Sequence, residues 1–220
     1  MDKLIIAIDG LTGTGKSHLS KYLADKLDIT YIDSGLFYRA VMYKVIRNSI
    51  KLNDYMGICK AAQMMKLIFE NDKVMLDDAD VTTQLRALDI TNKVTNICKI
   101  NALRRIINER LKKYAEDENG VLIEGKDIGV NVLPDAGYKF FITADMNART
   151  ARRHQDFLDL GQKISKDKID KELKLRDEFE LRKNPAILKR AENAEEVNTT
   201  NMILEEQVIY LYRIITNTQI

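Results

Sequence analysis

A single run of eight residues carries the strongest chemical signal in the sequence. It fits the phosphate-binding pattern G-x-x-x-x-G-K-S and reads Gly10-Leu11-Thr12-Gly13-Thr14-Gly15-Lys16-Ser17. Glycines at these positions let successive backbone N–H groups converge on phosphate oxygens, and the lysine ammonium can reach the terminal phosphates. The hydroxyl that follows the lysine is placed to bind Mg²⁺. The run therefore predicts a site for a phosphate chain.

The context of this run strengthens the prediction. The apolar segment Leu4–Ile8 precedes it and predicts a buried strand, and a helix is expected from Ser17 onward. The positive end of that helix would add to the same anion site. A glycine-rich turn that binds nothing is the alternative, but it would not require the two outer glycines, the lysine and the serine at this spacing.

A second group of polar residues follows the next predicted strand. Ser34 and Arg39 lie five residues apart after Thr30–Ile32, at the carboxyl end of a strand and in the first turns of a helix. Ligands bind at this edge of open α/β sheets. Arg39 could hold a second phosphate with its planar guanidinium, and Ser34 could donate a neutral hydrogen bond. An N-cap serine and a solvated helix arginine are the plainer interpretation.

A third group follows the predicted strand Val121–Ile123. Glu124, Lys126 and Asp127 would reach the same edge of the sheet as Lys16. The segment superficially repeats G-x-x-x-x-G-K, but no Ser or Thr follows the lysine, so a second phosphate loop is not expected. Near matches to the guanine-binding motifs of GTPases also lack the required residues or the required strand.

Arginines gather in the last third of the chain. Helical spacing places Arg149, Arg152 and Arg153 on one face, and Arg176 follows in a second charged helix. A solvated surface is one interpretation. The other is a cationic lid, because negative charge spreads over the equatorial oxygens during phosphoryl transfer and cations stabilise it.

Strand and helix patterns alternate along the chain, which predicts an α/β fold with a parallel sheet of the P-loop NTPase type and helices on both faces. We expect one domain, 1–220, with a core of 1–51 and 100–220, an insert at about 52–99 that contains a small hairpin at 73–82, and a lid at about 150–190. Two further strands are expected at Tyr138–Ile142 and Glu196–Val197. Helices are expected at Ser17–Leu27, Gly35–Asn48, Asn53–Glu70, Asn101–Glu116, Met146–Leu160, Lys166–Leu181 and Leu204–Thr216.

Composition narrows the class of protein. The 220 residues carry 35 Lys and Arg against 33 Asp and Glu, a net charge of +2 that gives no case for a nucleic-acid or membrane-surface protein.

Cys59 and Cys98 suggest neither a metal site nor a disulfide framework, so a reducing compartment is expected. No apolar run approaches the roughly 20 residues of a membrane span, and no signal peptide is expected. A cytoplasmic monomer is the simplest prediction.

Taken together, these motifs resemble the bacterial cytidylate kinase family over nearly the whole chain. The matching segments are Ile6–Gly10, Gly13–Lys16, Asp33–Gly35, Tyr38–Ala40, Glu124–Gly129, Pro134–Ala136 and Arg176–Glu178, in the family's order and spacing. The resemblance implies a nucleoside monophosphate kinase that uses ATP and Mg²⁺ to convert CMP or dCMP to the diphosphate. It also implies a substrate-binding insert and a short arginine-bearing lid.

The resemblance assigns roles residue by residue. Lys16, Arg39, Lys126, Arg152 and Arg176 would be catalytic, the eight residues of the loop would bind ATP, and Ser17 with Asp9 would serve the metal. The acceptor would contact Ser34, Arg39, Thr95, Arg104, Lys126, Asp127, Arg176, Glu180 and Lys183. Arg105 takes the place of Arg104 if the following loop is aligned without a one-residue insertion.

Three departures from the family fall on the acceptor side. Lys126 and Lys183 stand where the resemblance implies arginine, and Glu180 stands where it implies aspartate. A lysine is a point charge and cannot reproduce the bidentate fork of arginine. Kinase activity is therefore better supported than strict cytidine selectivity. A kinase for UMP, AMP or a non-nucleotide acceptor stays open, as does a regulator that binds ATP without an acceptor; an RNA-binding module lacks the basic and aromatic surface it would need.

Overall fold

The computed structural model describes residues 3–70, 73–159, 161–183 and 188–218, and all of their side chains except those of Glu70, Leu88 and Lys183. The chain divides into two compact units. The first, which we call the core unit, comprises Met1–Ile32 and Ala115–Ile220. The second, which we call the inserted unit, comprises Asp33–Tyr114. The predicted insert, 52–99, lies inside the inserted unit.

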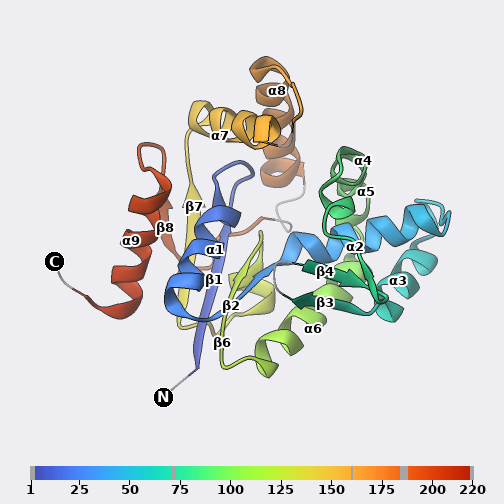
Figure 1. Ribbon diagram of the computed structural model, residues 1–220, viewed down its shortest axis with the longest axis horizontal. Coiled ribbons are helices and arrows are strands. Elements are labelled where there is room, and N and C mark those ends of the chain that lie inside the picture. The colour runs from blue at the N-terminus through green and yellow to red at the C-terminus, as the bar shows by residue number, and fades with distance from the viewer. Residues whose placement is uncertain (1–2, 71–72, 160, 184–187, 219–220) are drawn as a thin grey trace. The chain divides into compact units, whose positions relative to one another are not determined.

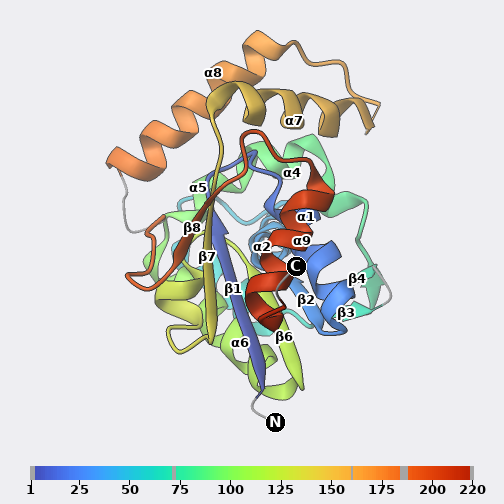
Figure 2. The ribbon, with the colours of Figure 1, turned by 90° about the vertical axis from the view of Figure 1, so that its left-hand side faces the viewer.

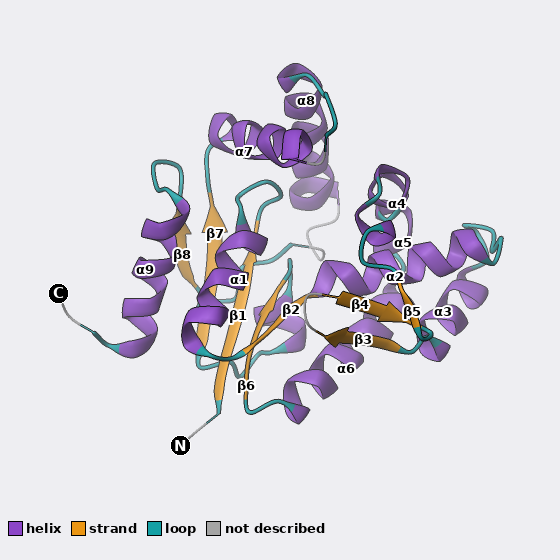
Figure 3. Ribbon diagram, in the orientation of Figure 1, coloured by secondary structure: helices purple, strands orange, loops and turns teal. Residues whose placement is uncertain are grey.

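A five-stranded sheet forms the centre of the core unit (Figure 3). β1 pairs in parallel with β6 and β7, and β7 pairs in parallel with β8. Side chains from Ile6 onward in β1 are buried, as expected for a strand that is covered on both faces. The expected parallel α/β sheet is thus confirmed. In spatial order the strands are β2 (Thr30–Asp33), β6 (Gly120–Glu124), β1 (Leu4–Gly10), β7 (Tyr138–Thr143) and β8 (Glu195–Asn198).

Two helices pack side by side on this sheet, α1 (Lys16–Leu27) and α9 (Leu204–Thr216) (Figure 1). Their apolar faces meet alternate residues of the strands, because side chains in a strand point to opposite faces in turn. α1 starts directly behind the phosphate loop, so burial of its apolar face holds that loop against the strand ends. The main members of this core are Ile6, Ile8, Leu19, Leu23, Leu122, Phe140, Ile142, Val197, Leu211 and Ile215.

A second helical pair, α7 (Met146–Asp159) and α8 (Lys166–Asp177), lies beyond the carboxyl ends of β1 and β7 (Figure 2). The two helices share a small apolar cluster of their own, built on Phe157, Ile169 and Leu173. The helix predicted over Lys166–Leu181 ends as an α-helix at Asp177 and continues as a π-helical turn, η3 (Glu178–Lys183). π-helical turns are often found at functional sites. A second such turn, η2 (Ile128–Val132), follows β6.

The inserted unit combines helices with a three-stranded sheet of order β3-β4-β5. Phe37, Phe69 and Tyr114 pack their rings together, with centroids 5.4 to 6.1 Å apart. The last helix, α6, runs out of this unit into the core unit. The elements are α2 (Ser34–Arg47), α3 (Tyr55–Met64), β3 (Leu67–Glu70), β4 (Lys73–Leu76), β5 (Ala79–Asp80), η1 (Gln84–Arg86), α4 (Leu88–Lys93), α5 (Thr95–Cys98) and α6 (Asn101–Asp117).

One helix prediction in this unit is wrong at its end. The helix expected over Asn53–Glu70 stops at Met64, and Leu67–Glu70 pairs with β4 as an antiparallel strand. Pairing with β4 buries Leu67 beside the predicted hairpin, a tertiary gain that local helix propensity does not contain. The hairpin itself is confirmed, with β4 and β5 as its strands. The side chains of Cys59 and Cys98 are partly buried.

No helix in the described part of the chain is long and apolar enough to cross a membrane.

Gly10, where β1 enters the loop, provides a test of this architecture. Its φ is +147°, and a Cβ at this position would lie 2.1 Å from the carbonyl oxygen of Ile142 in β7. Gly10→Ala should therefore lower the free energy of unfolding by roughly 2–4 kcal/mol, measured by denaturant titration, because backbone rather than a movable side chain blocks the methyl group. Gly137→Ala is the matched control, since nothing lies within 4 Å of its Cβ position. Equal stability of the two variants would contradict this account.

Candidate active site

The phosphate loop turns from β1 into α1 through two glycines in the left-handed region. The φ angles of Gly13 and Gly15 are +80° and +86°. Gly15 is the N-cap of α1, and no side chain caps the first N–H groups of the helix. The Thr14 hydroxyl donates to the Leu11 carbonyl, 3.0 Å away, and fixes the bend. Uncapped N–H groups and the positive helix end together make this loop suited to an anion.

Lys16 lies within the same loop. Its ammonium donates to the carbonyl oxygen of Leu11 at 2.8 Å, a neutral acceptor. Burial lowers the pKa of Lys16, although the nearby carboxylates of Glu124 and Glu180 act in the opposite direction. A phosphate chain in the loop would stabilise the charged form of this buried amine.

A carboxylate joins two cations beside the loop. Glu180, on η3, is only 4% exposed, and one of its oxygens accepts a hydrogen bond from the Lys126 ammonium. The other oxygen accepts from Nε of Arg176 at 3.0 Å. Lys126 also donates to the Thr12 hydroxyl of the phosphate loop, 3.0 Å away. The structure thus brings three predicted site residues together around the loop: Lys126, Arg176 and Glu180.

The charges in this cluster shift one another's protonation. Burial, with Arg176 and Lys16 nearby, lowers the pKa of Lys126 to about 7, although Glu180 opposes the shift. For Glu180, burial alone would raise the pKa, but the two cations outweigh it and hold that pKa below its usual value. A cation that is close to losing its proton would gain strongly from an anionic ligand.

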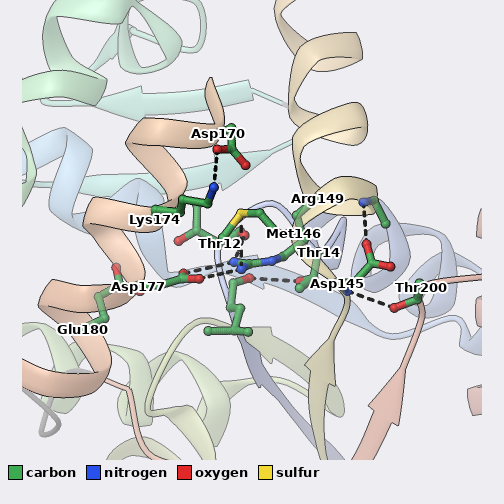
Figure 4. Close-up of polar contacts among 12 residues, drawn as sticks. Thr12, Thr14, Asp145, Met146, Arg149, Asp170, Lys174, Asp177, Glu180 and Thr200 are labelled. Atoms are coloured by element: carbon green, nitrogen blue, oxygen red, sulfur yellow. Dashed lines mark hydrogen bonds and ion pairs between the residues drawn. The ribbon is translucent and has the colours of Figure 1, made fainter. Parts of the chain in front are cut away.

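Arg149 and Arg152 tie α7 to the loop. Arg149, 3% exposed, donates to the Thr12 carbonyl at 3.1 Å and forms a two-pronged ion pair with Asp177, at 3.0 and 2.5 Å. Figure 4 shows this guanidinium reaching from α7 toward Asp177 on α8. Arg152 donates to the Thr14 carbonyl at 2.9 Å and to the Thr199 hydroxyl at 3.0 Å. The sequence pointed to the cationic face but not to the anchoring role of Arg149.

Asp9 is buried at the end of β1. Its two carboxylate oxygens accept hydrogen bonds from the N–H groups of Ile128 and Gly129, each at 2.8 Å. Burial raises the pKa of Asp9 to about 6, against the effect of these two donors. Asp9 therefore fixes the start of η2, a role that sequence reasoning missed.

Ser17 could contact a magnesium ion that is held mainly by a phosphate chain bound in the loop. Ser17 is exposed at the start of α1. Among the described residues, no group of three or more His, Cys, Asp or Glu side chains could enclose a metal ion. Mg²⁺ usually keeps several waters and binds through substrate phosphates and few protein groups, which agrees with this arrangement.

The remaining predicted acceptor residues lie on different elements. Asp127, buried in the core unit, accepts a hydrogen bond from the Asn131 side chain at 2.6 Å. In the inserted unit, Ser34 is buried at the start of α2, and Asp33, not Ser34, caps that helix. The Lys183 side chain lies outside the described residues.

Three more predicted residues belong to the inserted unit. Arg39 donates to the Leu85 carbonyl at 3.0 Å and to the Thr91 hydroxyl at 2.9 Å, which links α2 to η1 and α4. Thr95 is exposed at the start of α5. Arg104 is half-buried on α6 and Arg105 is exposed, and the Arg104 guanidinium donates to the Cys98 carbonyl at 3.4 Å.

A glycine-rich loop between a central parallel strand and a helix, with lysine and arginine gathered beside it, defines an α/β protein of the P-loop kinase class. Two solved structures share this fold: an uncharacterized protein from Eubacterium ventriosum (TM-score 0.55, 13% identity, 99% of this chain and 100% of that one) and a protein from Thermus thermophilus (TM-score 0.53, 12% identity, 100% of both).

Sequence relatives make the class specific. The family model described as "Cytidylate kinase" matches residues 6–217. The cytidylate kinase of Clostridioides difficile is 35% identical over 208 residues, which are 94% of this chain and 96% of that protein. That of Caldanaerobacter subterraneus is 37% identical over 210 residues, 96% and 93% of the two chains. The chain belongs to the cytidylate kinase family.

The Arg149–Asp177 pair should contribute strongly to stability. Arg149→Met leaves the Asp177 carboxylate, whose side chain is 16% exposed, without its partner, and we expect a loss of about 3 kcal/mol in the free energy of unfolding. Removing both charges in Arg149→Met/Asp177→Leu should restore part of that loss, because no lone charge then remains. A double variant as unstable as the sum of the two single variants would argue against the pair.

Proposed function

We propose that this protein transfers the terminal phosphoryl group of ATP to CMP or dCMP and forms the corresponding diphosphates. Membership in the cytidylate kinase family supports the activity. The observation that supports it within the molecule is the cluster around Glu180, which holds Lys126 and Arg176 beside the phosphate loop. Such an arrangement can neutralise charge on both a donor and an acceptor phosphate.

The chemistry needs orientation and charge stabilisation more than proton transfer. The second pKa of a phosphate monoester is about 6, so the acceptor oxygen is already anionic at neutral pH and needs no general base. In the proposal, the eight residues of the loop hold the ATP phosphates, with Lys16 on the β and γ groups. Arg152 and Arg176 stabilise the transferring group, and the buried walls around Glu180 exclude water.

The metal would be held by few protein groups. Ser17 would supply a hydroxyl ligand, and Asp9 would act through water because both of its oxygens already accept backbone hydrogen bonds. When bound, Mg²⁺ would offset the negative charge of the donor phosphates.

The acceptor assignments rest on the family resemblance. Arg39, Ser34 and Lys126 would hold the acceptor phosphate. Arg39 already has one guanidinium nitrogen fixed by Leu85 and Thr91, which would orient it for that task. The sugar and base would contact Thr95, Arg104, Asp127, Arg176, Glu180 and Lys183. The resemblance assigns the insert, 52–99, to acceptor binding and the segment 150–190 to a lid. The protein would act as a cytoplasmic monomer without a nucleic-acid partner.

A panel of acceptors tests this function against its rivals. ADP release from ATP should be stimulated most by CMP and dCMP and less by UMP, AMP or a non-nucleotide acceptor. Stimulation by UMP equal to that by CMP would indicate relaxed base selectivity, which lysine in place of arginine at position 183 would explain. ADP release that ignores every acceptor would favour an ATP-dependent regulator and would overturn the proposal.

Lys16 should be required for turnover and not for folding. Lys16→Ala should lower kcat by about two to four orders of magnitude, since a preorganised cation on the transferring phosphates is lost. The melting temperature should stay close to that of the wild type, because the ammonium's only described hydrogen bond goes to the Leu11 carbonyl. Lys26→Ala, at an exposed position of α1, is the control. Near-wild-type turnover of Lys16→Ala would refute the assignment.

The protonation of Lys126 should be visible in the pH profile. Its pKa is lowered to about 7, so the ammonium loses its charge as the pH rises through this value. kcat/KM for the acceptor should therefore fall on the alkaline side of about pH 7, since kcat/KM reports the free enzyme. In Lys126→Arg the alkaline fall should move far upward, because arginine stays protonated. The same fall in both proteins would exclude Lys126 as its cause.

A further inference from the structure

Thr12 occupies a position that the phosphate-loop pattern leaves open to any residue, yet it contacts two cations from different elements. Its carbonyl oxygen accepts a hydrogen bond from Arg149 at 3.1 Å. Its side-chain hydroxyl accepts one from the Lys126 ammonium at 3.0 Å. The donor loop is thereby bonded on one side to α7 and on the other to the segment behind β6.

Both cations lead onward to the same helical segment. Arg149 pairs with Asp177 at the end of α8, and Lys126 pairs with Glu180 one turn later on η3. Glu180 in turn pairs with Arg176, the residue next to Asp177. Thr12 therefore closes a ring of contacts that starts in the phosphate loop and returns to it through the residues proposed to handle the acceptor.

We propose that the Thr12 hydroxyl is a positioning group for the acceptor phosphate: although it belongs to the loop that binds ATP, it acts by fixing the Lys126 ammonium. This inference rests on the proposed function. It assigns a side-chain role to a loop position whose backbone alone is expected to serve ATP.

The chemistry of lysine explains why a second anchor matters. A lysine ammonium is a point charge on a flexible four-carbon stem, so one contact leaves it a choice of positions. Glu180 alone would draw Lys126 toward η3, where Arg176 carries a like charge. The Thr12 hydroxyl holds the ammonium at the phosphate loop instead, next to the group that is to be transferred.

The hydroxyl can be removed without disturbing the rest of the ring. Thr12→Val keeps the β-branched shape and the backbone carbonyl that Arg149 contacts, and Thr12→Ser keeps the hydroxyl without the methyl group. The comparison of the two variants therefore isolates the contact with Lys126.

Steady-state kinetics with CMP and ATP varied separately provide the test. Thr12→Val should raise KM for CMP roughly tenfold, as expected for one hydrogen bond to a charged group, and change KM for ATP much less. Thr12→Ser, which keeps the hydroxyl, should reverse most of the rise in KM for CMP. In a Lys126→Met background, Thr12→Val should change KM for CMP no further, since the residue it acts through is gone.

Three results would overturn the inference. They are an effect of Thr12→Val on KM for ATP alone, an equal effect on both substrates, and an undiminished effect on CMP in the Lys126→Met background. Thr12→Ala replaces Thr12→Val if the latter melts more than a few degrees below the wild type. A wild-type enzyme that does not use CMP at all would instead remove the proposed function, so the two failures are distinguishable.

Discussion

A buried carboxylate that neutralises two cations is the interaction on which the arrangement around the phosphate loop depends. Without Glu180, Lys126 and Arg176 would face each other as like charges in a partly buried place, and the Lys126 ammonium would move away or lose its proton. With Glu180 in place, both cations stay near the loop, and η3 is bonded to the segment that follows β6. The same carboxylate limits how positive the cluster becomes, which keeps the pKa of Lys126 near neutrality instead of lower still.

The contact between Lys126 and Glu180 also gives a physical setting for two departures from the family. The resemblance implies arginine and aspartate at these two positions, and this chain has a lysine paired with the longer carboxylate. Both changes therefore fall within a single ion pair, in which the longer side chain of glutamate can reach the ammonium of a lysine that replaces arginine. The Arg149–Asp177 pair anchors α7 and α8 to the same loop from the opposite side.

Periodicity and motif spacing were enough to predict much of the core unit. The apolar run that precedes Gly10 predicted β1, because a strand that is buried between layers of helices needs an apolar run. The glycine pattern and the helical pattern after Lys16 predicted the loop and α1. The features that the sequence did not predict depend on tertiary contacts. β3 forms because Leu67 pairs across to Leu76, and η3 departs from α-helical form at the point where Glu180 meets Lys126. The roles of Thr12, Asp9 and Arg149 likewise depend on partners more than 100 residues away.

For the proposed function, Lys126 and Arg176 must exchange part of their contact with Glu180 for contact with substrate phosphates. A crystal structure of the protein with a bisubstrate analogue, in which cytidine and adenosine are joined by a phosphate chain, tests this most directly. The account predicts the Lys126 ammonium and the Arg176 guanidinium within hydrogen-bond distance of that chain, whose adenosine end occupies the loop from Gly10 to Ser17. A phosphate chain bound in the loop while both cations remain on Glu180 alone, without contact to any phosphate oxygen, would contradict it.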